Sequence, residues 1–532
     1  MGIEIGYRRI SQFVISIAAL AILAGGCTKV GPDFVKPDTT VNPSWMEAKD
    51  YNQITTKTED YRKWWRAFKD PVLDKLIQTA YHQNLPLRVA GVRVLAARAL
   101  LGVATGELYP QTQKAVGEVT KNRMSQTSPT GGFGAPDNYW LAQTGLTASW
   151  EIDFWGKFRR AVESANSSLV ATVADYDNAL VSLTSDVATS YILYRTLEKR
   201  LSIAHQNVLV QKKSLEIANA RWKGGTTSKR DVEQALTVLY STEASIPTLE
   251  SQLRQTQNAL CVLMGMPPRN LSHLLGTKFS IPAPPPQVAV GIPADLLRRR
   301  PDIQSAEWRA AAQCAQIGVH KANLYPAFSI SGSFGLQASD VAPFVLGNIF
   351  DWKSRLGTIG PSFQWNLFNY GQITNEVRYQ DALFQAAIIT YQNTVLQAQQ
   401  EVENALIAFL KSQQRAQKLA GAVTAAQKTV DLATLQYSEG IADFTTVLVA
   451  EQNLLTQQDS LATTLGNISG NLVAVYRALG GGWQIRQGHS FVPKSIKKVM
   501  AKRTNWGKLI TPAAFIPPSP EKPQSDIRLP DW

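Results

Sequence analysis

The sequence is poor in the residues that bind metals or form disulfides, with three cysteines and five histidines among 532 residues. The histidines are scattered, and there is no His-Glu-x-x-His pair, phosphate-binding glycine loop or nucleophile elbow. We therefore expect no metal site, no cofactor and no catalytic residue, so an enzyme is not predicted. Cys261 and Cys314 lie in apolar helical stretches, which favours small buried side chains over a disulfide framework.

Long apolar segments are also missing after the N-terminus, where no run reaches the ~18 residues that a spanning helix needs. Residues 1–26 have the pattern of a secretory signal, because two arginines precede an apolar stretch that ends at Leu23. Ala24-Gly25-Gly26-Cys27 is similar to a bacterial lipoprotein cleavage site, which predicts a covalent lipid on Cys27. Lipoprotein signals usually carry Leu where Ala24 stands, so cleavage without acylation is the alternative.

The chain is basic, with a formal net charge of +13. The predicted signal contains Glu4, Arg8 and Arg9, so the mature chain carries 13 − 1 = +12. Part of the excess lies in one C-terminal stretch: Lys494, Lys497, Lys498, Lys502, Arg503 and Lys508. Aromatic and basic residues do not interleave there, so nucleic acid is not an expected partner, and a solvated tail is the simpler interpretation.

The main feature of the sequence is an internal repeat. An apolar seam with alternating steps of four and three runs from Phe384 to Tyr437, and a matching seam lies 215 residues earlier, from Leu169 to Trp222. A mean spacing of 3.5 is typical of helices packed along one face. A helix from about Lys157 to Trp222 would be roughly 100 Å long, which predicts an elongated molecule.

Segments with period-two alternation precede each long helix. They lie near 112–123, 142–154, 328–336 and 362–367, and they predict four half-apolar strands of about ten residues, the length of a membrane-crossing strand. A soluble sandwich would show the same alternation, but the export signal and the Gly- and Ser-rich hairpins favour a membrane. Four strands cannot close a barrel, so several chains would have to share one.

Four motifs resemble the TolC-like outer-membrane factors, the outer membrane efflux protein family, in its lipoprotein branch. They are Cys27-Thr28-Lys29-Val30-Gly31-Pro32, the mid-chain Arg299-Arg300-Pro301-Asp302-Ile303, the junction Trp365-Asn366-Leu367-Phe368, and Ala478-Leu479-Gly480-Gly481-Gly482-Trp483. Asn369 and Tyr370 replace the usual Asp-Gly or Gly-Gly after the third motif.

The resemblance implies a mainly α fold with a small β part: a duplicated long-helix α-barrel continued by a transmembrane β-barrel. Four strands per chain would give twelve in a homotrimer. The trimer would be lipid-anchored in the bacterial outer membrane and extend into the periplasm. Its expected partners are outer-membrane lipid, a periplasmic membrane-fusion adaptor and an inner-membrane efflux pump, most simply of the RND type.

The family's helix-turn-helix tips close the tunnel and meet the adaptor. Their pattern falls here on Arg221, Trp222, Gly225, Ser228, Asp231, Val232, Tyr437, Gly440, Asp443 and Val447. Turn chemistry alone also accounts for the two glycines, and Ser228 and Asp443 are expected to N-cap the returning helices. Some members have acidic gate positions where this chain has Thr446 and Val449, so Asp431, Glu439 and Asp443 are the candidate gate residues.

These patterns divide the chain into five parts. They are a signal peptide (1–26), an extended lead (27–63), a first repeat (64–291), a second repeat (292–482) and an irregular tail (483–532). The predicted function is an outer-membrane conduit of a tripartite efflux or export system. A membrane-anchored coiled-coil scaffold without a channel is the alternative, although it leaves the four strands unexplained.

Overall fold

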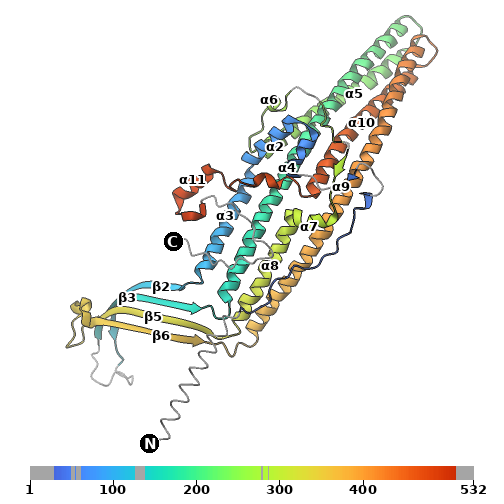
Figure 1. Ribbon diagram of the computed structural model, residues 1–532. Coiled ribbons are helices and arrows are strands. Elements are labelled where there is room, and N and C mark those ends of the chain that lie inside the picture. The colour runs from blue at the N-terminus through green and yellow to red at the C-terminus, as the bar shows by residue number, and fades with distance from the viewer. Residues whose placement is uncertain are drawn as a thin grey trace.

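The computed structural model describes residues 29–48, 54–55, 61–125, 138–276, 280–285 and 287–510. Over these residues the chain is an elongated bundle of helices, with a four-stranded sheet at one end and two helical turns at the other (Figure 1). Cys27 and the predicted signal peptide lie outside the described residues.

The two halves of the chain repeat one order of elements. The first half contains α3 (Leu85–Gly106), β2 (Thr112–Arg123), β3 (Asn138–Ile152), α4 (Lys157–Lys223) and α5 (Lys229–Leu263). The second contains α8 (Pro301–Ala322), β5 (Ala327–Ser339), β6 (Arg355–Gln364), α9 (Gln372–Ser438) and α10 (Phe444–Ala478). Corresponding helices have equal lengths of 22, 67 and 35 residues. The internal duplication and the mainly α fold class are confirmed.

Short elements connect and cover these helices. They are η1 (Met46–Ala48), β1 (Ile54–Thr55), η2 (Tyr61–Phe68), α2 (Pro71–Gln83), α6 (Ser272–Leu275), β4 (Val288–Ala289), η3 (Pro293–Asp295), α7 (Leu296–Arg299), η4 (Leu346–Phe350), η5 (Trp352–Ser354), η6 (Trp483–Arg486), α11 (Lys494–Arg503) and η7 (Gly507–Ile510). None of the described helices combines the length and the apolarity that a membrane span requires.

The predicted seams form the core between the long helices. On α9, the seam residues Tyr391, Val395, Ala398 and Val402 are at most 1% exposed. α4 packs against α3, α5, α8 and α10, while α9 packs against α8 and α10. The 3.5-residue spacing keeps one stripe of each helix against its neighbours over the whole length, which is why both helices reach 67 residues.

Two equivalent joints stack shorter helices end to end. The Asn84 side chain accepts from the Leu87 amide at the start of α3 and donates to the Leu263 carbonyl at the end of α5, both at 2.8 Å. In the second half, Arg300 Nη1 donates to the Ala478 carbonyl at 2.8 Å, joining the end of α10 to the start of α8. Each joint satisfies a carbonyl that a helix end would leave unpaired, and it holds the shorter helices end to end.

The sheet is antiparallel in the order β2-β3-β5-β6, and its register separates two faces. Trp150 lies opposite Ile330, and Leu146 lies opposite Phe334. One face carries the apolar row Leu146, Trp150, Ile152, Phe328, Ile330, Phe334, Ile359 and Phe363, and the other carries Gln143, Thr147, Ser149, Ser329, Ser331, Ser333, Thr358 and Ser362. Within the described residues, β2 and β6 each pair with one strand, so both leave an open edge there.

The segments at the two ends of the described chain lie on the outside of the bundle. Residues 29–45 run without regular structure along α8 and α9, where Lys36 Nζ contacts Glu307 at 2.6 Å and the Asn42 amide donates to Gln399 at 3.0 Å. The prediction of an irregular tail after residue 482 is wrong for the ten residues of α11. Ile496 and Met500, four positions apart, give this helix an inward-facing side that its many lysines obscure in the sequence.

Candidate functional site

The tip of the molecule is built from two equivalent turns, between α4 and α5 and between α9 and α10. Gly225 (φ +72°) and Gly440 (φ +80°) have the left-handed backbone that a helix C-terminal turn requires, as predicted. Ser228 and Asp443 occupy the N-cap positions of α5 and α10, but neither side chain makes a capping hydrogen bond. The capping role predicted for these two side chains is therefore wrong.

A polar network joins the two turns. The Tyr437 hydroxyl donates to Asp231 Oδ2 at 3.3 Å, and Thr227 Oγ1 donates to the same oxygen. The Arg221 side chain donates to the Tyr437 carbonyl, and its Cζ atom lies 4.6 Å from the centre of the Tyr437 ring. Burial raises the pKa of Tyr437, and the Asp231 charge acts in the same direction, so the hydroxyl stays protonated and remains a donor. We call Arg221, Thr227, Asp231 and Tyr437 the tip latch.

Burial divides the predicted tip residues into two groups. Asp231, Val232, Tyr437 and Val447 are at most 6% exposed, and Val447 and Tyr437 pack with Phe444 in a small core at the tip. Trp222, Gly225, Ser228, Gly440 and Asp443 are exposed, while Arg221 is half-buried. The first group can act only through packing and the latch, whereas the exposed group offers a surface to a partner.

The three candidate gate carboxylates do not join the latch. Asp431 accepts from Gln427 at 3.1 Å, and within the described residues Asp431, Glu439 and Asp443 make no ion pair. Thr446 and Val449 are exposed on α10. The tip carboxylate with several partners is Asp231, which the sequence patterns assign to the docking surface and not to the gate.

Glu451, which the sequence analysis misses, lies buried between α10 and α4. Its carboxylate is 2% exposed and accepts from the Ser214 hydroxyl at 2.5 Å. Gln211, one turn earlier on α4, is equally buried, and its amide has no hydrogen-bond partner within the part of the chain that the structure describes. The signal is present in the sequence, because Phe444, Val447, Glu451 and Leu454 follow helical core spacing and a carboxylate is out of place in such a row.

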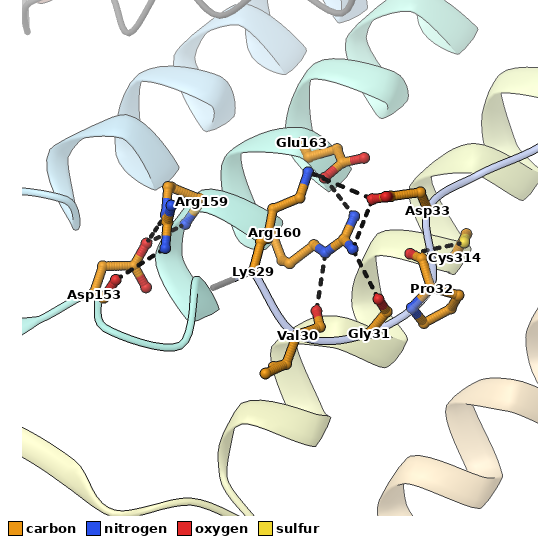
Figure 2. A network of polar contacts seen from close by, with 10 residues as sticks. All are labelled: Lys29, Val30, Gly31, Pro32, Asp33, Asp153, Arg159, Arg160, Glu163 and Cys314. Atoms are coloured by element: carbon orange, nitrogen blue, oxygen red, sulfur yellow. Dashed lines mark hydrogen bonds and ion pairs between the residues drawn. The ribbon is translucent and has the colours of Figure 1, made fainter. Parts of the chain in front are cut away.

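A second polar site holds the N-terminal residues at the junction of sheet and helices (Figure 2). Arg160, 1% exposed near the start of α4, donates to the carbonyls of Val30 at 3.1 Å and Gly31 at 3.0 Å. It also pairs with Asp33 and Glu163, both at 2.9 Å, and Lys29 reaches Glu163 at 2.7 Å. We call this group the N-terminal clamp. It fixes the chain two residues after Cys27 (29 − 27 = 2).

The clamp depends on the absence of a side chain at Gly31. Its backbone has φ +93°, and a Cβ atom there would lie 2.5 Å from the Cα of Gly318. Gly318 is equally confined, because its own Cβ would meet the Val30 carbonyl at 2.7 Å. The two backbones therefore touch directly, and Arg160 closes over the contact.

Substituting Gly31→Ala is expected to release the N-terminal segment, because α8 backbone cannot move away from the new methyl group. Trypsin should then cleave after Lys29 about ten times faster than in the wild type, since the loss of roughly 1–2 kcal/mol opens the segment more often. Gly276→Ala is the matched control, with φ +67° but open space around its Cβ. Equal cleavage in both variants would show that a general loss of stability, not the contact with Gly318, is responsible.

Glu451 should make the packing of the tip depend on pH. Burial raises the pKa of its carboxyl above the ordinary 4.5, and the Ser214 bond opposes this only in part. The packed state therefore binds the proton more tightly, so its stability is greatest below the ordinary pKa and falls as pH rises through the raised value. Hydrogen exchange at the α4–α10 contact, corrected for its intrinsic rate, should accelerate from pH 4 to pH 8.

Glu451→Gln should remove this pH dependence and slow exchange at pH 7 by roughly tenfold, because no charge remains to be buried. Glu250→Gln, at an exposed position on α5, serves as the control. A pH profile that persists in Glu451→Gln would exclude this residue as its source.

The comparisons with known proteins agree with this architecture. The profile described as outer membrane efflux protein matches residues 76–266 and again residues 292–481. Nodulation protein T of Rhizobium leguminosarum bv. viciae is 30% identical over 501 residues, which cover 93% of this chain and 98% of that protein. The pyoverdine export outer membrane protein OpmQ of Pseudomonas putida is 31% identical over 429 residues, or 80% of this chain and 88% of that protein.

A solved structure is also similar over most of this chain. The outer-membrane channel OprN matches with a TM-score of 0.79 and 32% identity, covering 86% of this chain and 100% of that one. The predicted resemblance to TolC-like factors and the outer-membrane location are confirmed. Two profile matches spanning most of the chain, and relatives aligned over nearly their full lengths, lead to one conclusion: the chain belongs to the outer membrane efflux protein family.

Proposed function

We propose that three copies of this chain close one conduit across the outer membrane and the periplasm. The observation that carries the proposal is the open sheet: β2 and β6 are 12 and 10 residues long, and neither has an outer partner among the residues that the structure describes. Lipid offers no hydrogen bonds to such edges. Pairing β6 of one copy with β2 of the next gives three times four, or twelve, strands in a closed barrel.

The two faces of the sheet suit this arrangement. The apolar row is largely uncovered in the single chain, with Ile359 86%, Phe363 71% and Leu146 63% exposed. Outward in a barrel, this row would meet lipid, while the Ser-, Thr- and Gln-rich face would line an aqueous lumen. The long helices would continue the wall, and exposed apolar residues on α9, such as Ile389 and Leu396, supply a face for a neighbouring copy.

A lipid on Cys27 would fasten the same end of the molecule to the membrane. The N-terminal clamp holds residues 29–33 against Arg160, at the point where strands give way to helices. An acyl chain two residues earlier would therefore begin beside the barrel wall. The clamp would thus convert a flexible tether into a fixed attachment.

The tip would meet a periplasmic adaptor that joins the conduit to an inner-membrane pump, with the RND class as our candidate. The exposed residues Trp222, Gly225, Ser228, Gly440 and Asp443 form the proposed docking surface. The latch beneath them would hold the two hairpins together until a partner binds. Related proteins named for nodulation and pyoverdine export suggest small exported molecules as the class of cargo.

Single-channel recording in planar bilayers tests the function directly. The purified mature protein should give discrete conductance steps, because a shared barrel encloses a continuous aqueous path. A membrane-anchored scaffold, the alternative function, would give none. Loss of the steps after deletion of β6, with helix content unchanged, would tie the conductance to the strands.

Tyr437→Phe is expected to loosen the tip. The substitution removes the hydroxyl that binds Asp231 and costs about 1 kcal/mol of the closed state, a shift of about fivefold in the closed-to-open ratio. The ratio of open to closed time in planar bilayers should rise by that factor. Tyr240→Phe, at an exposed tyrosine of α5 (61% exposed), should leave it unchanged, and an unaltered Tyr437→Phe channel would remove the latch from the account.

Changes on the exposed tip surface should weaken export without dissociating the trimer. Asp443→Lys reverses a charge at the proposed docking surface, and a bulky residue at Gly440 would crowd Arg221, whose Nη2 lies 3.4 Å from an added Cβ. Each change should cost about 1–2 kcal/mol of binding free energy at the interface. We therefore expect the resistance of bacteria that produce either variant to fall about tenfold toward exported compounds. Wild-type export by both would contradict the docking assignment.

A further inference from the structure

The C-terminal segment extends beyond the part of the chain that the family profile matches. The match ends at residue 481, and 532 − 481 = 51 residues follow. The described portion, up to residue 510, folds back onto the outside of the bundle and places α11 beside α3, away from both the sheet and the tip (Figure 1). The efflux architecture described above does not use this segment.

The placement of the segment is built into the core. Arg486 makes two bonds to Asp177 on α4, at 2.5 and 2.7 Å, with both residues at most 7% exposed. Phe491 packs against Tyr176 with ring centres 5.1 Å apart, and Met500 of α11 is 6% exposed. A segment that only trailed in solvent would not bury a charged pair, so α11 is held at a defined place.

The outer side of α11 carries charge of one sign. Lys494, Lys498 and Lys502 lie four positions apart and therefore form a line, with about 6 Å of rise between neighbours. Arg503 adds a fourth exposed cation, and within the described residues none of the four makes an ion pair. No Asp or Glu occurs from Trp483 to Pro520. Like charges at this spacing repel, so an external anion would relieve the helix.

The position of the segment separates the candidate anions. Phe491 contacts Tyr176, which lies 176 − 157 = 19 residues into α4, or about 29 Å along the helix from the sheet. The field of charged lipid headgroups decays within about 8–10 Å at physiological salt. A membrane surface is therefore too distant, and the anion has to lie in the periplasm.

We propose that α11 is a docking surface for peptidoglycan, the carboxylate-bearing polymer through which an outer-membrane protein of this length has to pass. The lysine line would follow a row of polymer carboxylates, and the Arg486–Asp177 pair would hold the helix facing outward. The proposal rests on the outer-membrane location of the chain and not on conductance, so either can fail alone.

The test is co-sedimentation of the purified full-length protein with isolated peptidoglycan sacculi at low and high salt. Wild-type protein should pellet with sacculi at low salt and be released at high salt, as charge-driven binding requires. The variant K494Q/K498Q/K502Q/R503Q should bind at least about tenfold more weakly, given the strength of several basic residues at an anionic surface. Its helix content and conductance should match the wild type, because the four side chains are exposed.

A matched variant distinguishes binding at α11 from binding through the overall positive charge of the protein. K63Q/K75Q/K199Q/K213Q removes four exposed lysines elsewhere and changes the net charge equally, so it should bind sacculi like the wild type. Equal loss in both variants, or no loss in the α11 variant, would overturn the proposal. So would wild-type binding to anionic vesicles in preference to sacculi, which would identify lipid as the partner.

Discussion

The hydrogen-bonding requirement of strand backbones governs the design of this molecule. β2 and β6 are long, unbroken edges, and their sheet has an apolar face and a polar face. In water, such edges would pair non-specifically with strands of other molecules and cause aggregation. In lipid, each backbone group without a hydrogen bond costs several kcal/mol of free energy. A symmetrical ring of identical chains removes both problems. Because the long helices continue from the strands, the proposed closure at one end would also arrange the helices around a common axis.

The helical part solves a different problem, namely how to stay straight over about 100 Å. Its seams bury aliphatic and aromatic side chains along the long helices. The shorter helices meet at joints where Asn84 and Arg300 satisfy carbonyls at the ends of α5 and α10. Polar contacts then become prominent near the tip: Ser214 with Glu451, and Tyr437 with Asp231. Polar pairs hold helices together with less free energy than an apolar seam, which would suit the opening of the tip that we propose.

The sequence predicts the periodic features well. The first long helix is expected from about Lys157 to Trp222 and runs from Lys157 to Lys223, because a seam repeated over many turns leaves little freedom in its register. The four strands and both tip turns are found for the same reason: alternation and left-handed glycines are local signals. Because the chain is duplicated, each of these elements is predicted twice, once in each half.

The polar sites depend on residues far apart in the chain, and local patterns do not reveal them. Arg160 binds Val30 and Gly31 across about 130 positions, and Tyr437 meets Asp231 across 206. The capping expected of Ser228 and Asp443 is wrong because neither side chain accepts from a backbone amide of its helix, although both residues occupy the N-cap positions. α11 is missed because two inward residues among many lysines are a weak pattern. Glu451 is the exception, since a carboxylate in a core row is visible in the sequence.

The central claim is that one chain cannot satisfy its own strand edges and that three copies do so together. Native mass spectrometry of the mature protein released from detergent measures this directly. A single species of three chains is expected. Its strand content, followed by circular dichroism, should persist until the assembly is heated. A stable monomer with the full strand content would contradict the claim, because its edges would then be satisfied without partners.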